Sequence, residues 1–117
     1  MTDNSNLFRP VASVLQAKSL AIVGASERAA WPSMIYKNLR QFGYPGRIVL
    51  VNPRQKEVFG ERCYPTLRDL PETVDHALVI VPAGGVPDVL MDGEATGVKS
   101  ATVYSGMLGE GDVKLLF

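Results

Sequence analysis

Residues 19–33, Ser19-Leu20-Ala21-Ile22-Val23-Gly24-Ala25-Ser26-Glu27-Arg28-Ala29-Ala30-Trp31-Pro32-Ser33, pass from an apolar run through a turn of small residues into a helical pattern. The apolar run ends at Gly24, and the helical pattern begins near Ser33. This order predicts a buried strand, a tight loop and a helix N-terminus. A helix N-terminus presents unpaired N–H groups and the positive end of the helix dipole, and small residues before it let a phosphate approach the backbone. The first hypothesis is therefore that a phosphate-bearing ligand binds at this turn.

The rest of the chain continues the alternation of strands and helices. We predict strands over residues 20–24, 47–52, 76–81 and 100–104, helices over 33–42 and 86–96, short extended pieces around 58–59 and 62–64, and a helical turn over 66–70. Ser33 is a plausible N-cap, and Gly43 and Gly97 are plausible helix stops. The expected inward-facing residues are Met34, Ile35, Leu39 and Phe42 on the first helix and Val86, Val89, Leu90 and Met91 on the second.

The two ends of the chain carry separate expectations. We expect one domain over residues 1–117, with residues 1–6 disordered and residues 7–17 forming a short amphipathic helix. Residues 112–117 are expected to start a helix that remains incomplete. An apolar helix that is cut off leaves surface that needs cover. We therefore favour a domain truncated at its C-terminal part, a fragment of a longer protein, over a short docked terminal helix.

Alternating strands and helices at this spacing predict an α/β fold, a Rossmann-like doubly wound parallel sheet in a single domain. Ligands of such sheets bind beyond the carboxyl ends of the strands. Small, polar or proline residues stand at those ends, namely Gly24-Ala25-Ser26, Asn52-Pro53-Arg54, Pro82-Ala83-Gly84 and Ser105-Gly106.

Composition narrows the class of protein. The 117 residues are 46% hydrophobic, and 12 basic side chains balance 12 acidic ones, which argues against nucleic-acid or membrane binding driven by net charge. No apolar run is long enough to span a bilayer, and no signal-peptide pattern opens the chain. Cys63 is the only cysteine, so an internal disulfide is impossible and a cytoplasmic location is expected.

The residues at the ends of the first two strands indicate which nucleotide would bind. The NAD fingerprint needs two further glycines after Gly24 and an acid at the end of the second strand, and both are missing. Arg54 and Lys56 follow the second strand instead. Cations at this edge suit a phosphorylated ribose, which leaves coenzyme A (CoA) and NADP as candidates.

An ordered set of short motifs along the chain is similar to the pattern of a known family. The set comprises Leu20-Ala21-Ile22-Val23-Gly24-Ala25-Ser26, Lys37-Asn38-Leu39, Gly46-Arg47-Ile48, Val51-Asn52-Pro53, Tyr64-Pro65, Val81-Pro82-Ala83 and Ser105-Gly106-Met107. With these motifs the chain resembles the CoA-binding domain of the NDP-forming acyl-CoA ligases, such as ADP-forming acetate–CoA ligase, which are relatives of the succinyl-CoA synthetase α subunit. The resemblance covers residues 7–111.

The resemblance implies a Rossmann-like domain that binds CoA as the N-terminal part of an acyl-CoA synthetase. The Gly-Ala-Ser turn would lie at the CoA phosphates, and the ligase and ATP-grasp domains of the same or another chain would be partners. The isolated chain is then expected not to be catalytic, and a homo-oligomer is conceivable. Pro32 stands where the family often has glycine, which puts one backbone contact of the loop in doubt.

Thirteen residues are candidates for ligand contact. They are Gly24, Ala25, Ser26, Arg28, Asn52, Pro53, Arg54, Lys56, Val81, Pro82, Ala83, Ser105 and Gly106. We expect His76 to be structural, Cys63 to be a partly buried thiol, and no metal site to form from one cysteine and one histidine. The alternatives are a stand-alone CoA-binding regulatory protein and an NADP-binding oxidoreductase domain.

Overall fold

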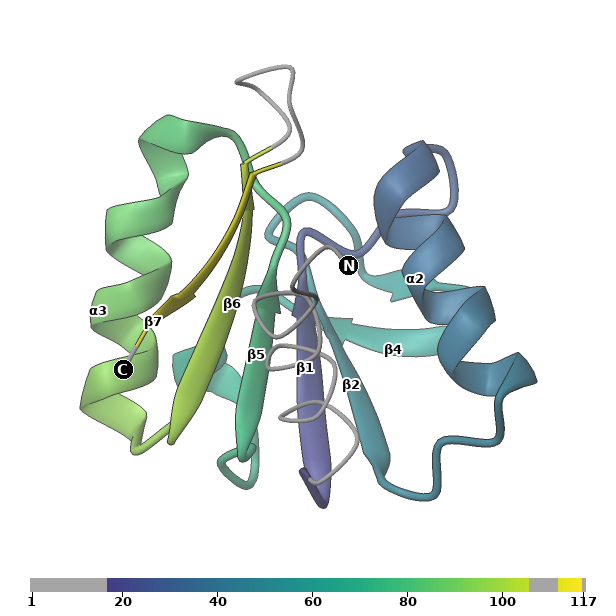
Figure 1. Cartoon of the computed structure of the whole chain (residues 1–117), viewed down its shortest axis with the longest axis horizontal. Helices are drawn as coiled ribbons and strands as arrows, with labels where there is room; N and C mark the ends of the chain where they lie inside the picture. The colour runs from purple at the N-terminus through teal and green to yellow at the C-terminus, as the bar shows by residue number, and fades with distance from the viewer. Residues whose placement is uncertain (1–16, 106–111, 117) are drawn as a thin grey trace, which may run out of the picture.

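A computed structural model describes residues 17–105 and 112–116 (Figure 1). The elements in chain order are β1 (Ser19–Val23), α2 (Ala30–Gln41), β2 (Arg47–Val51), β3 (Glu57–Val58), β4 (Glu61–Tyr64), the 3-10 turn η1 (Leu67–Asp69), β5 (His76–Val79), the 3-10 turn η2 (Ala83–Gly85), α3 (Val86–Thr96), β6 (Ser100–Ser105) and β7 (Asp112–Leu116). The four predicted long strands and two predicted helices are all present. The helix expected over residues 7–17 lies outside the described residues.

The strands form one sheet in the order β3-β4-β2-β1-β5-β6-β7. The five central strands are parallel, and the outer strands β3 and β7 are antiparallel to their neighbours. From β1 the chain moves to β2 on one side and later to β5 on the other, so the strand order reverses at β1. This is the switch point at which doubly wound sheets bind ligands, and the predicted Rossmann-like α/β class is confirmed.

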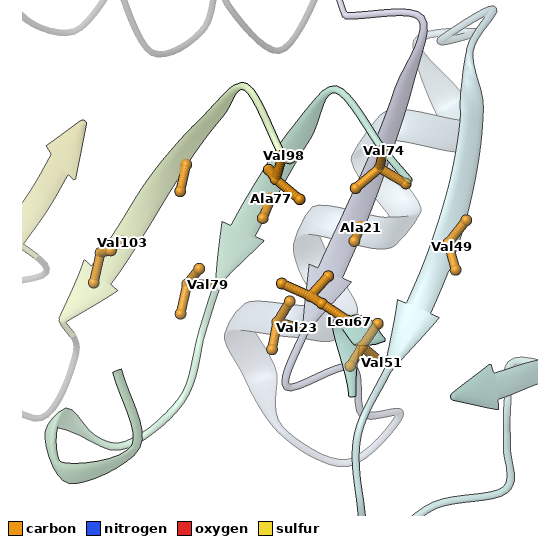
Figure 2. Packing of buried hydrophobic residues seen from close by; sticks show 11 residues of the cluster. Ala21, Val23, Val49, Val51, Leu67, Val74, Ala77, Val79, Val98 and Val103 are labelled. Carbon is orange, nitrogen blue, oxygen red and sulfur yellow. The ribbon is translucent and has the colours of Figure 1, made fainter. Parts of the chain in front are cut away.

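The core lies on both faces of the sheet because the central strands are apolar on both sides. Ala21 and Val23 face one layer, together with Val49 and Val79 (Figure 2). Val86, Val89 and Leu90 of α3 pack against this layer. Leu20 and Ile22 face the other layer, whose partly buried members include Ile35, Tyr36 and Leu39 of α2. Each long helix therefore covers a different face of the sheet.

Helix α2 begins three residues earlier than predicted. Its N-cap is Ala29, so Ser33 is not the N-cap but a buried residue inside the helix. Pro32 is the third helical residue, where an N–H would have no partner within the helix, and proline is tolerated there. The early start leaves the loop after β1 with only residues 24–29. The predicted stop at Gly43 is confirmed by its φ of +72°.

Three residues expected on the inner faces of the helices point outward. Met34 is exposed, and the exposed fractions of Phe42 and Met91 are 83% and 62%. Phe42 lies at the C-cap of α2, beyond the last helical turn, and therefore leaves the apolar stripe. The correct inner residues recur three to four positions apart, as Ile35 and Leu39 do.

Residues 112–116 form strand β7 and not the start of a helix. β7 pairs antiparallel with β6, with Ser105 opposite Asp112 and Ala101 opposite Leu116. Five or six residues give too few backbone hydrogen bonds to nucleate a stable helix, whereas each residue of an added edge strand finds a ready partner. The sequence Asp-Val-Lys-Leu also alternates polar and apolar residues, as strands do. Among the described helices, none is long and apolar enough to cross a membrane.

Candidate functional site

A cleft of about 580 Å³ opens at the carboxyl ends of β1, β2, β4 and β5. Two of its sides are the loops after β1 and β2, and the others come from η1 and α3. Most of the lining is apolar. The lining residues are Val23, Gly24, Ser26, Ala29, Val51, Asn52, Pro53, Arg54, Pro65, Thr66, Leu67, Ile80, Val81, Pro82, Gly85, Asp88, Val89 and Asp92.

Gly24 makes the sharp turn out of β1. Its φ is +95°, and a β-carbon at this position would lie 2.1 Å from Ile80 O. The amides of Gly24 and Ala25 both donate to Val51 O, at 2.7 and 3.2 Å. The end of β1 is thus tied to the end of β2 and pressed against the segment after β5, which only glycine allows.

Ser26 organises the loop that leads into α2. Its Oγ accepts hydrogen bonds from the amides of Arg28 and Ala29, each at 3.1 Å. These two amides are therefore engaged inside the loop. The hydroxyl proton of Ser26 is not needed for either bond and can be donated into the cleft. The hydroxyl is the donor that this side of the cleft offers to an anion.

Asn52 joins the two loops beside Arg54. Its Nδ2 donates to Ala25 O at 2.9 Å, and its Oδ1 accepts from the amide of Arg54 at 2.9 Å. Both ends of the side-chain amide are occupied, so Asn52 shapes the cleft. Arg54 itself is exposed at the cleft and brings a guanidinium that can form two parallel hydrogen bonds with a phosphate.

Two carboxylates on α3, Asp88 and Asp92, also line the cleft. Asp92 Oδ1 accepts from Arg68 Nε at 2.6 Å, which links α3 to η1. η1 is closed by a capping box between Thr66 and Asp69. The sequence analysis missed both α3 acids. Their spacing of four residues, which puts them on one face of a helix that follows a strand end, was the available signal.

The structure brings seven of the thirteen predicted contact residues into the cleft: Gly24, Ser26, Asn52, Pro53, Arg54, Val81 and Pro82. Ala25 is buried in the core behind the turn, and Arg28 and Lys56 are exposed outside the cleft lining. Ala83 lies in η2 between Pro82 and Gly85, and Ser105 ends β6. Gly106 lies outside the described residues. Of the three predicted cations, Arg54 alone lines the cleft among the described residues.

The groups that could react elsewhere in the chain are held in unreactive forms. Burial raises the pKa of the Cys63 thiol, and the S–H donates to Asn52 O at 3.8 Å, so the thiolate is disfavoured. Burial lowers the pKa of His76 to about 4, and its ring nitrogens are 2.6 and 2.8 Å from Ser100 Oγ and Thr102 Oγ1. His76 is structural, as predicted. No group of three potential metal ligands forms within residues 17–105 and 112–116. The groups that line the cleft can bind and orient a ligand.

Comparisons with known proteins agree with this geometry. The model of the family described as CoA binding domain matches residues 18–114. An ADP-forming acetate–CoA ligase of Archaeoglobus fulgidus is 39% identical over 92% of this chain, and one from Methanocaldococcus jannaschii is 37% identical over 80%. This chain spans only 15% and 13% of the length of those two proteins.

Solved structures show the same fold. A dinucleotide-forming acetyl-CoA synthetase of Candidatus Korarchaeum cryptofilum matches 84% of this chain and 20% of its own, with a TM-score of 0.65 and 35% identity. A hypothetical protein from Pyrococcus horikoshii matches 77% of this chain and 63% of its own, with a TM-score of 0.67 and 26% identity. The chain belongs to the CoA binding domain family and is homologous to part of the ADP-forming acetate–CoA ligases.

Proposed function

We propose that the cleft binds coenzyme A, with the diphosphate beside the Ser26 loop and the ribose 3′-phosphate beside Arg54. One observation carries the proposal: in a chain of this family, the predicted turns after β1, β2 and β5 converge on one cleft at the switch point of the sheet. The cleft volume of about 580 Å³ is within the range of sites for cofactors and other small molecules.

The chemistry of the cleft suits each part of this ligand. The Ser26 hydroxyl and the start of α2 favour an anion, and Arg54 can meet a phosphate with two parallel hydrogen bonds. Apolar residues such as Leu67, Val81 and Val89 suit the flat adenine ring. A dinucleotide of the NAD type would lack the phosphate that Arg54 would bind.

We further propose that the chain serves as the CoA-binding part of an ADP-forming acyl-CoA ligase. The two ligases compared above are more than six times as long as the matched segment, and the described site carries no activated nucleophile. The acid-activating and nucleotide-binding steps would then belong to ligase and ATP-grasp domains in the same or another chain. The CoA thiol would be the group that this domain presents to them.

A second candidate is a stand-alone CoA-binding protein. The observation in its favour is the Pyrococcus horikoshii protein, of which this chain covers 63%, so that protein is little longer than one such domain. The two candidates share the cleft and its ligand. The mass of the native protein, measured directly from the source cells, would separate them.

The first experiment is a calorimetric titration of the chain with CoA, 3′-dephospho-CoA, NAD and NADP at low salt. We expect CoA to bind, and to bind about tenfold more tightly than its dephosphorylated form, a difference of about 1.4 kcal/mol. Arg54→Gln should remove this difference because the guanidinium is lost from the cleft. Lys56→Gln is the matched control, since Lys56 is an exposed cation outside the cleft lining.

Three results would contradict the proposal in different ways. Preference for NADP over CoA would favour an oxidoreductase domain. Equal binding of both forms of CoA by the unaltered chain would keep the ligand but remove Arg54 from the 3′-phosphate. A loss of the preference in Lys56→Gln but not in Arg54→Gln would place the phosphate on the outer side of the loop after β2.

A further inference from the structure

The charged side chains that line the cleft come from different elements according to their sign. Arg54 and the Ser26 hydroxyl stand on the wall built by the loops after β2 and β1. Asp88 and Asp92 stand on the wall built by α3. An anion is attracted to the first wall and repelled by the second. A ligand that fills this cleft must therefore carry its phosphates at one end and a hydrogen-bond donor at the other.

The two carboxylates of α3 are not equivalent. Asp92 is the more buried, with 22% of its side chain exposed, and its charge is balanced by Arg68 at 2.6 Å. Asp88 is exposed in the first turn of α3. No other side chain within residues 17–105 is hydrogen-bonded to Asp88. Its oxygens are thus charged acceptors that are available to a ligand in the cleft.

We propose that Asp88 is a specificity-determining residue that accepts a hydrogen bond from the exocyclic amine of adenine. This inference rests on the proposed function. With the phosphates held by the first wall, the base lies between η1 and α3, where Pro65, Leu67 and Val89 supply apolar contact. A base with a carbonyl oxygen in place of the amine would bring an acceptor against a carboxylate, which costs affinity.

The test compares CoA with its deaminated analogue, in which hypoxanthine replaces adenine at equal size and charge. By titration of the unaltered chain we expect CoA to bind about tenfold more tightly than the analogue, the size of effect that one hydrogen bond to a charged group supplies. In Asp88→Asn the two ligands should bind about equally, because an amide can accept from the amine or donate to the carbonyl. Asp88→Leu should also lose the preference and bind CoA more weakly.

Glu94→Gln is the matched control, because Glu94 is an exposed acid on the same helix outside the cleft lining. It should keep the tenfold preference. A preference that persists in both Asp88 variants would overturn the inference and leave CoA binding intact. Asp88 variants that bind both ligands more tightly by the same factor would also overturn it, since Asp88 would then act only by repelling phosphates. A chain that binds no CoA would refute the proposed function itself, and the inference with it.

Discussion

At Gly24 the arrangement of the strand ends that form the cleft depends on the absence of a side chain. The residue holds φ at +95° while its amide bonds to Val51 O, and the backbone carbonyl of Ile80 fills the space that a β-carbon would need. Glycine is required here twice over, for its backbone conformation and for the close approach of two strand ends. Gly43 has a similar φ of +72° but open space around it. A comparison of Gly24 with Gly43 therefore separates the effect of the backbone conformation from the effect of the close approach.

We expect Gly24→Ala to lower the free energy of unfolding by at least about 2 kcal/mol, because backbone strain and a steric clash act together. Gly43→Ala should cost about 1 kcal/mol, the strain alone. Urea denaturation followed by circular dichroism measures both. Equal losses in the two variants would mean that the turn at Gly24 relaxes and that the contact with Ile80 is not fixed.

The sequence predicts the residue types of the site better than their roles. Gly24, Ser26, Asn52 and Arg54 are found in the cleft, because strand ends in a parallel sheet converge whatever their side chains. The side-chain amide of Asn52 forms hydrogen bonds to two neighbouring loops through both its oxygen and its nitrogen. These bonds depend on the register of β1 and β2, which the sequence pattern does not specify. Asp88 is missed because its place in the cleft depends on the packing of α3 against η1.

At the scale of elements, the central strands are the best predicted, because strands buried on both faces are continuous apolar runs. The sequence predicts the start of α2 and the structure of residues 112–116 less well, for two physical reasons. The prediction starts the helix after Pro32, but proline is tolerated in the first helical turn, where α2 places it. An isolated apolar tail reads as a helix start, yet the open edge of β6 offers it backbone partners. Tertiary pairing outweighs local propensity in the second case.

The bonds between β5 and β6 give the stability of the sheet a pH dependence. His76 is buried between Ser100 and Thr102, and burial lowers its pKa from 6.5 to about 4. Between these two values the unfolded chain binds a proton that the folded chain does not, so stability falls as the pH falls. The full shift corresponds to a loss on the order of 3 kcal/mol by pH 4.

Urea unfolding at pH 7.0, 5.5 and 4.5 tests this dependence, with His76→Asn as the comparison. Asparagine can still bond to a hydroxyl but does not titrate. We expect the unaltered chain to lose stability more steeply than the variant over this range, since carboxylates titrate in both. Parallel profiles would show that His76 becomes protonated without unfolding the sheet locally.

At the scale of the whole molecule, the amino ends and the carboxyl ends of the parallel strands differ in structure. They are called here the amino edge and the carboxyl edge of the sheet. The amino edge is closed by hydrogen bonds to Asp75. Its backbone O accepts from the amides of Lys99 and Ser100, and its side-chain Oδ2 accepts from the amide of Lys18. At the carboxyl edge the loops after β1 and β2 and the segment after β5 line the cleft, beside the switch point of the strand order. This division follows from topology, which is why the location of the site can be predicted from the strand order before any side chain is placed.

Hydrogen exchange in the presence of CoA tests this division. At a CoA concentration of 100 times its Kd the folded state gains about 2.7 kcal/mol, and every amide that exchanges by global unfolding slows accordingly. Amides that exchange by local opening respond only where the ligand lies. We expect added protection in residues 24–29, 52–54 and 80–89, and no local protection in the turns at Asp75 and Gly97 on the opposite edge. Local protection at the amino edge, with none at the carboxyl edge, would place the ligand on a surface other than the cleft.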